Sequence, residues 1–340
     1  MLEERKAQIN RAKTGSLRLP LVSILVPSYN SKAFLNDCLE SALGQTYPRV
    51  ETVVVDDGSN DGSLELACGF RSRGVRVIVQ ENRGQPSALN AAFGAANGEV
   101  FQYLDSDDVL HPRKIEVQMS RLLCADPMAM ASGAWARFRS SLSSSVFEPE
   151  GVWQDLSPVD WLVQSWSGGG MMHVAGWLIP RRVVEAAGPW VDSLRWAANV
   201  DADFFTRTLL ASTRCLFCSE ARSYYRTVPG SQSSLKSRKN LEASLSVLIR
   251  IGEALLLREN SVRTREAFAD QLQRFVYSAY PDSRDLVSLA ETRIRELGGS
   301  QLSYAGGTVT LGVAKWLGWK PAGRFRQVAD AVRRAVRVAK

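Results

Sequence analysis

This 340-residue sequence lacks any apolar run that approaches the roughly 20 residues needed to cross a bilayer. Its first ten residues, MLEERKAQIN, are charged and contain no apolar stretch of the kind found in secretory signals. The sequence therefore predicts a cytoplasmic location.

Cysteine and histidine are also scarce. The five cysteines are odd in number and scattered, which argues against a disulfide framework. Cys215 and Cys218 form a single CxxC without a second pair or nearby histidines, so two small residues near a strand are favoured over a zinc or redox site. The only histidines are His111 and His173.

Three nucleotide-related motifs are missing. No GxGxxG follows the first expected strand, which excludes a Rossmann dehydrogenase. That strand also lacks the Gly- and Arg-rich phosphate loop expected of a nucleotidyltransferase. The first two thirds contain no Lys/Arg-rich motif with interleaved aromatics, so no nucleic-acid partner is expected. The net charge of +7 then leaves an anionic membrane, an anionic substrate or plain solubility as its explanation.

What is present is an alternation of short apolar runs and helical patterns. Apolar runs predict four strands, each followed by a polar turn. Helical spacing of apolar residues predicts helices between them. This order is typical of right-handed βαβ units and a parallel sheet. The expected strands are 21–26, 50–55, 75–80 and 100–104, and the expected helices are 31–43, 63–70 and 86–96.

Polar clusters follow three of these strands: Ser28-Tyr29-Asn30, Asp56-Asp57 and Asp105-Ser106-Asp107. In an open parallel sheet, ligands bind beyond the carboxyl ends of the strands, so the topology brings these segments together. Asp105 and Asp107 can converge on one hard cation such as Mg²⁺ or Mn²⁺, although strand-end aspartates also serve as turn formers or caps. Asp57 can accept a hydrogen bond from a ribose or a base, or simply form an Asp-Gly turn.

Five segments in order resemble the family 2 glycosyltransferases, which adopt the GT-A fold. The resemblance covers Val22 to about Arg226, and its motifs are VSILVPSYN (22–30), VVVDDGSNDGS (53–63), ENRGQPSALNAA (81–92), GEVFQYLDSDD (98–108) and HPRKIEVQ (111–118). It implies an α/β domain with a mostly parallel sheet flanked by helices, followed here by a C-terminal helical extension. It also implies an inverting, metal-dependent transfer of a sugar from a nucleotide-diphosphate sugar, with UDP as the commonest nucleotide.

The resemblance assigns roles to individual positions. Pro27 and Tyr29 match positions that hold the nucleotide base, and Asp57 matches the carboxylate that reads it. Asp105 matches the position that faces the ribose and metal, and Asp107 matches the direct ligand of Mn²⁺ or Mg²⁺. Asp108 is interpreted as structural.

The general base is expected on a helix that begins near residue 201. Inverting transfer is one in-line displacement, in which a carboxylate takes the proton of the acceptor hydroxyl. Asp201 aligns with that base, but Val200 replaces the usual preceding Glu, and Asp203 remains a rival. The alternative interpretation is that Asp201 only caps the helix.

Other polar residues leave alternatives open. Many relatives carry Arg where this chain has Leu89, so either Arg83 takes part of that role or the donor differs. Arg226, with the following Ser231-Gln232-Ser233, resembles a segment that closes over the diphosphate, or is a surface arginine. His173 follows Gly168-Gly169-Gly170, interpreted as a mobile loop, and is a structural histidine in preference to an acceptor or metal contact.

The last third differs in pattern. Residues 239–297 show helical periodicity, residues 308–319 are apolar with Trp316 and Trp319, and residues 320–340 form a basic amphipathic pattern typical of the membrane interface. The alternative is a helix packed on its own domain. The expected division is an arm at 1–20, a GT-A domain at 21–232, a helical extension at 233–300 and a tail at 301–340.

These observations predict a glycosyltransferase that acts on a glycan or lipid-linked acceptor, in envelope or cell-surface glycan synthesis, with peripheral attachment to the inner face of the membrane through the tail. The competing hypothesis is a non-catalytic scaffold that binds nucleotide sugars through a decayed GT-A domain, for which Val200 is the supporting observation.

Overall fold

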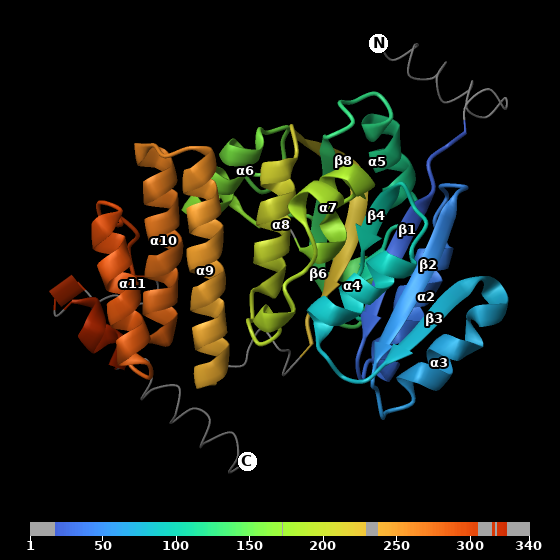
Figure 1. Cartoon of the computed structure of the whole chain (residues 1–340), viewed down its shortest axis with the longest axis horizontal. Coiled ribbons are helices and arrows are strands. Elements are labelled where there is room, and N and C mark those ends of the chain that lie inside the picture. Colours follow the sequence, from blue (N-terminus) through green and yellow to red (C-terminus); the bar gives the residue numbers. More distant parts are fainter. Residues whose placement is uncertain (1–17, 172, 229–236, 305–314, 317, 325–340) are drawn as a thin grey trace. The chain divides into compact units, whose positions relative to one another are not determined.

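The computed structural model describes residues 18–171, 173–228, 237–304, 315–316 and 318–324. Most of the expected N-terminal arm, the Ser231-Gln232-Ser233 segment and most of the basic tail lie outside these residues. The chain divides into two compact units, one within Met1–Arg195 and Asn199–Ser231 and the other within Trp196–Ala198 and Gln232–Lys340 (Figure 1).

The first unit is built on a five-stranded sheet in the order β3-β2-β1-β4-β7. The first four strands run parallel, and β7 pairs antiparallel with β4. Each central strand is a run of β-branched and aliphatic residues that is buried along most of its length, as parallel strands covered on both faces must be. The bounds are β1 Val22–Ser28, β2 Val50–Asp57, β3 Val75–Gln80, β4 Val100–Tyr103 and β7 Ile179–Pro180.

Helices cover both faces of this sheet. On one face, Leu35 and Leu39 of α2 join Ile24 of β1 in a single hydrophobic cluster. Since successive side chains of a strand alternate, Leu25 and Val53 face the other side, where α4 contacts β1 and β2. The bounds are α2 Lys32–Leu43, α3 Ser63–Gly69 and α4 Gln85–Ala95. The expected mostly parallel α/β fold is confirmed, and its element bounds lie within a few residues of the sequence-based ones.

A second, three-stranded sheet in the order β5-β8-β6 was not predicted from the sequence. Its strands are β5 Val109–Leu110, β6 Met130–Phe138 and β8 Cys215–Arg226. The register of β6 and β8 shifts at Gly133, where a Cβ atom would lie 2.2 Å from the Ala221 carbonyl oxygen, so only glycine fits this close approach. Both cysteines of the CxxC lie in β8, buried and with free thiols, which confirms the structural interpretation.

The apolar sequence VAGWLI at 174–179 suggests a strand, but most of it does not form one. Val174–Gly176 forms a 3-10 turn, and only Ile179–Pro180 joins the sheet. The apolar run is buried, but a buried turn and a buried strand share the same composition, so hydrophobicity alone could not separate them. The remaining elements of the first unit are α5 Lys114–Leu122, α6 Pro158–Gln164, α7 Arg181–Ala187, α8 Val200–Ala211, a π-turn at Ser165–Gly169, and 3-10 turns at Arg71–Arg73, Leu142–Ser144 and Asp192–Leu194.

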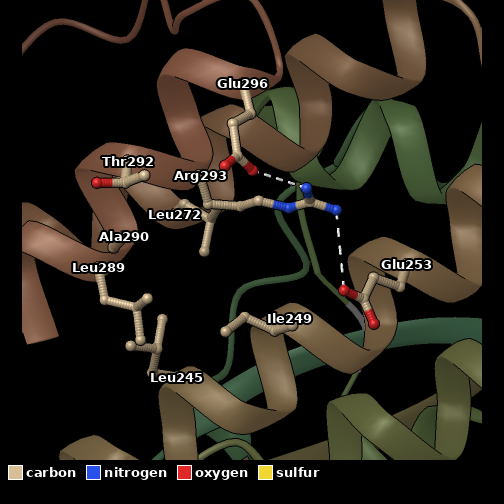
Figure 2. A pocket seen from close by; sticks show the side chains of 9 residues that line it. All are labelled: Leu245, Ile249, Glu253, Leu272, Leu289, Ala290, Thr292, Arg293 and Glu296. Carbon is tan, nitrogen blue, oxygen red and sulfur yellow. Dashed lines mark hydrogen bonds and ion pairs between the residues drawn. The ribbon is translucent and has the colours of Figure 1, made fainter.

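The second unit contains three long helices, α9 Arg238–Arg258, α10 Val262–Ala279 and α11 Arg284–Glu296, which confirms the helical interpretation of 239–297. A pocket of about 240 Å³ lies among them (Figure 2). Leu245, Ile249 and Leu272 line its apolar part, and Arg293 pairs with Glu296 at 2.9 Å on its rim. None of the residues predicted to be functional lines this pocket.

Among the described helices, none combines the length and apolarity that a membrane span requires. In the described part of the tail, Trp319 packs against Tyr277, Tyr280 and Tyr304, with ring centroids 5.1, 5.2 and 6.5 Å away. Trp316 is 84% exposed. The two tryptophans therefore differ: Trp319 is packed on its own unit, and Trp316 faces solvent.

Candidate active site

The nucleotide-side residues stand at the carboxyl ends of β1 and β2. Pro27 is buried within β1, whereas Tyr29, one residue beyond the strand, is 52% exposed. Asp57 is the last residue of β2. The parallel register pairs Ser28 with Asp56, so these strand ends lie side by side. The exposed tyrosine and the strand-end carboxylate thus share one edge of the sheet.

The Asp57 carboxylate also fixes the turn that leads into α4. Its Oδ1 accepts the Arg83 backbone N–H at 2.9 Å and the Gln80 side-chain amide at 2.6 Å, and its Oδ2 accepts the Gly84 N–H at 2.8 Å. Gly84 has φ of 91°, a conformation that favours glycine. Asp57 therefore acts at least as the anchor of this turn, and one lone-pair direction on Oδ2 remains for a ligand.

Gln85, the next residue, connects this turn to the second carboxylate cluster. Its side-chain amide donates to Asp105 Oδ1 at 2.8 Å. The sequence had placed Gln85 only beside an expected helix start. Its position between the glycine of a strand-to-helix turn and a Pro at N1 or N2 is a sequence signal that could have drawn attention to it.

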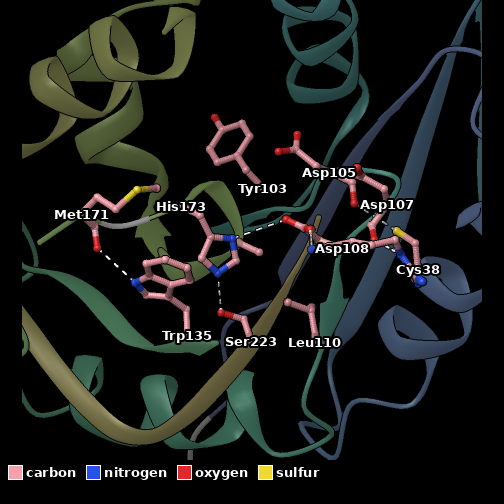
Figure 3. Close-up of polar contacts among 12 residues, drawn as sticks. Cys38, Tyr103, Asp105, Asp107, Asp108, Leu110, Trp135, Met171, His173 and Ser223 are labelled. Carbon is pink, nitrogen blue, oxygen red and sulfur yellow. Dashed lines mark hydrogen bonds and ion pairs between the residues drawn. The ribbon is translucent and has the colours of Figure 1, made fainter. Parts of the chain in front are cut away.

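Asp105 to Asp108 form the turn that follows β4, and it closes with the Asp108 N–H donating to the Asp105 carbonyl at 3.0 Å. Figure 3 shows the three carboxylates of this turn gathered together. Burial, then the charges of Asp108, Asp107 and Asp201, raise the pKa of Asp105 well above its ordinary value. Burial likewise raises the pKa of Asp107 and Asp108. The cluster therefore concentrates negative charge in a poorly solvated place.

Asp108 is buried and structural, as its position suggested. Its Oδ1 accepts the Arg226 backbone N–H at 2.9 Å, and its Oδ2 lies 3.4 Å from His173 Nδ1 (Figure 3). His173 Nε2 lies 2.9 Å from Ser223 Oγ. Burial, followed by the charges of Lys114 and Arg137, lowers the pKa of His173 to about 3, so the imidazole is neutral at physiological pH. These contacts support the structural role expected of His173.

Asp201 occupies the second position of α8, behind the N-cap residue Asn199. Asp201 is therefore not the N-cap residue of this helix. Burial raises the pKa of the Asp201 carboxyl, while the N–H groups of Ala202 and Asp201 itself oppose this shift. Its charge contributes to the raised pKa of Asp105, so the two carboxyl groups interact electrostatically. Val200 begins the helix and is buried.

Asp203, the rival base, is committed elsewhere. Its side chain is 2% exposed and accepts Arg207 Nη2 at 2.7 Å and Nε at 2.9 Å. The same guanidinium donates to the carbonyls of Ala187, Gly188 and Pro189. Asp203 thus joins α8 to the end of α7, and this contact pattern disfavours it as a base.

The two arginines expected at the donor differ in their contacts. Arg226 is 7% exposed, donates from Nε to the Asp107 carbonyl at 2.8 Å and from Nη2 to Asp37 at 2.9 Å, and stacks 4.4 Å from the Phe138 ring. Its guanidinium therefore holds the acidic turn in place. Arg83 is 64% exposed and lies 3.8 Å from Asp192, so it keeps free donors at the surface.

The carboxylate oxygens of this turn suit a divalent cation that is held partly by the protein and partly by a bound substrate. Two carboxylates with pKa values raised by burial, Asp105 and Asp107, present hard oxygen ligands at one turn. Within the described residues, no group of three or more His, Cys, Asp or Glu side chains forms a complete cation cage. Mg²⁺ and Mn²⁺ commonly take one or two carboxylates and complete their shell with water and substrate phosphates.

Residues 23–145 match the model of glycosyl transferase family 2. An uncharacterized glycosyltransferase of Rickettsia prowazekii is 40% identical over 103 residues, covering 30% of this chain and 32% of that protein. A glycosyltransferase of Streptococcus pneumoniae, GlyG, is 41% identical over 99 residues, covering 28% and 33%. The match therefore spans about a third of the length of each of these relatives.

Solved structures share the fold over a longer stretch. S. aureus TarS in complex with UDP-GlcNAc has a TM-score of 0.63 at 17% identity, covering 82% of this chain and 81% of that one. A mannosyltransferase from Pyrobaculum calidifontis, in complex with GDP-Man and Mn²⁺, has a TM-score of 0.51 at 18% identity, covering 98% and 94%. At these identities the likeness establishes the GT-A fold and no more.

Proposed function

We propose that this protein is an inverting glycosyltransferase that moves a sugar from a nucleoside diphosphate sugar to a hydroxyl acceptor. The observation that carries the proposal is the buried acidic turn after β4, which holds Asp105 and Asp107 and in which the charge of Asp201, at the start of α8, acts on Asp105. Two of these carboxylates suit a metal-bound diphosphate, and the third suits a base on the acceptor side.

In this mechanism Tyr29 and Asp57 bind the nucleoside, with the tyrosine ring stacked on the base. Asp105 and Asp107 would hold Mn²⁺ or Mg²⁺, which would neutralise charge on the diphosphate leaving group. Asp201 accepts the proton of the acceptor hydroxyl as that oxygen forms its bond to the anomeric carbon. Its raised pKa suits this role, because a base works best when its pKa is close to the operating pH.

A UDP-sugar is the proposed donor, and a glycan or lipid-linked molecule of envelope synthesis the proposed acceptor. Neighbours of this fold that bind UDP-GlcNAc or GDP-Man support a nucleotide-sugar donor. The Mn²⁺ in one of them supports a metal-dependent enzyme.

The test is the thermal midpoint of the purified protein against a panel of nucleotide sugars, each with Mn²⁺, Mg²⁺ or a chelator. A ligand that binds only the folded state raises the midpoint. We expect one donor to give a shift that requires metal and disappears in Asp107→Ala. Ser106→Ala is the matched control, because it leaves both carboxylates of the same turn in place. A folded protein that responds to no donor would contradict the proposal and favour the scaffold hypothesis.

A further inference from the structure

A group of residues beside the acidic turn has no role in the mechanism above. It consists of Trp135 and Arg137 on β6 and Tyr225 on β8. The strand register pairs Arg137 with Tyr225 and Trp135 with Ser223, so these side chains share one face of the second sheet. We call this group the Arg137 platform.

The guanidinium of Arg137 is held by two aromatic rings. Its central carbon lies 4.9 Å from the Tyr225 ring centroid and 5.3 Å from that of Trp135. Arg137 is exposed, and within the described part of the chain its guanidinium has no ion pair and no hydrogen bond. The two rings are inclined at 77° to each other, so the guanidinium can stack face to face on only one of them. Its N–H groups form a fork that matches the oxygens of a phosphate or carboxylate.

The platform is rigid. Trp135 is 8% exposed, and its indole N–H lies 3.2 Å from Glu150 and 3.1 Å from the Met171 carbonyl (Figure 3). Glu150 also accepts the Met171 backbone N–H at 3.1 Å. A fixed Trp ring fixes the arginine stacked on it, which lowers the entropy cost of binding a ligand there.

The platform also lies close to the acidic turn. His173, which contacts Asp108, has its ring 5.5 Å from Trp135 and 5.6 Å from Tyr225. Burial, then the charge of Asp108, raises the pKa of Tyr225, while the charge of Arg137 opposes the shift. The Tyr225 ring thus lies between an exposed cation and the acidic turn. The charge of Arg137 also acts on Glu150, which bonds the Trp135 indole. An exposed cation near a cluster of acids creates a place where a ligand with both a hydroxyl and an oxyanion can be oriented.

We propose that the Arg137 platform is an acceptor subsite, and that the acceptor carries an oxyanion, a phosphate or a carboxylate, near the hydroxyl that is glycosylated. Arg137 forks onto the oxyanion, and the Tyr225 hydroxyl and the Trp135 ring contact the adjoining polyol or sugar. The acceptor specificity deepens the proposed function and rests on it, but the anion site itself can be tested by binding alone.

The experiment is saturation-transfer NMR of small acceptor mimics with UDP and Mg²⁺ at saturating concentration, so that the donor diphosphate site is already filled. The probes are glycerol 3-phosphate and glucuronic acid, against uncharged glycerol and glucose. We expect both anionic probes to bind at least tenfold more tightly than the uncharged ones. Arg137→Gln should remove that preference, and Arg137→Lys, which keeps the charge but loses the fork, should retain part of it.

Arg139→Gln is the matched control, because it removes the same charge two residues along the chain. Arg139 is exposed, has no ring contact among the residues that the structure describes, and its carbonyl remains to accept from Arg226. We expect Arg139→Gln to bind the probes like the unmodified protein. The affinity for UDP should be the same in the unmodified protein, Arg137→Gln and Arg139→Gln. An equal loss in both glutamine variants would show a bulk charge effect and overturn the proposal. So would an unchanged preference in Arg137→Gln, no preference in the unmodified protein, or binding that UDP abolishes. If UDP fails to bind but the anion preference depends on Arg137, the donor chemistry has failed and the anion site stands.

Discussion

Asp201 and Asp203 lie two residues apart on one helix, and the structure predicts opposite consequences for the same substitution. Asp201→Asn removes a carboxylate that interacts electrostatically with Asp105 but breaks no ion pair. We expect turnover to fall about 100-fold or more, because general-base catalysis contributes on the order of 10²–10⁴-fold. Donor binding should be retained, and stability should stay equal or rise, because one of several mutually repelling charges is gone.

Asp203→Asn instead breaks a buried pair with Arg207. Removing one partner of a buried pair costs about 3–5 kcal/mol. We expect about 3 kcal/mol, since the carbonyls of Ala187, Gly188 and Pro189 still accept from Arg207. For a unit of this size that lowers the thermal midpoint by about 6–12 °C. Turnover per folded molecule should stay within a few-fold.

The assay pairs a thermal melt with donor turnover, each measured below the midpoint of the weaker variant. UDP affinity with Mn²⁺ serves as a control that the donor site is intact. A stable Asp203→Asn protein with lost turnover, next to an active Asp201→Asn, would refute the reasoning and move the base to Asp203. Full activity in both variants would remove the base from α8 altogether.

Three further predictions follow from the same contacts. Gln85→Ala should weaken metal-dependent UDP binding roughly 5- to 10-fold, as measured by titration calorimetry, because the hydrogen bond to Asp105 is lost. The thermal midpoint should stay unchanged, because alanine suits the first turn of α4. An unchanged UDP affinity would show that Asp105 does not need this hydrogen bond. Burial raises the pKa values of Asp105, Asp107 and Asp201, so these groups bind protons more tightly in the folded state, and the metal-free protein should gain stability as the pH falls from about 7.5 toward 5.5. Mn²⁺ or Asp105→Asn should reduce that gain. A thermal midpoint that falls steadily over this range would contradict the prediction. Deleting residues 305–340 should reduce sedimentation with anionic vesicles if the basic tail binds membranes. Unchanged sedimentation would contradict that hypothesis. Because the deletion also removes the packed Trp319, a thermal melt must show that the truncated protein is still folded.

The sequence by itself determined the first sheet and the location of the site. Apolar runs that end in Tyr29, Asp57 and Asp105 specify parallel strands, and parallel strands bring their carboxyl ends to one edge whatever the rest of the chain does. The three helices of the second unit could also be predicted from the sequence, because helical periodicity is a local signal.

Only the tertiary structure decided which polar residues are free to act. Asp201 and Asp203 look alike in sequence, and it is the position of Arg207 that commits one and leaves the other to interact with Asp105. Arg226 looked available for phosphate until its bonds to Asp107 and Asp37 were known. The second sheet was not predicted because β8 pairs with β6 about 85 residues earlier, and long-range pairing leaves no local pattern. That pairing also places Arg137 between two rings, an arrangement that composition and spacing do not encode.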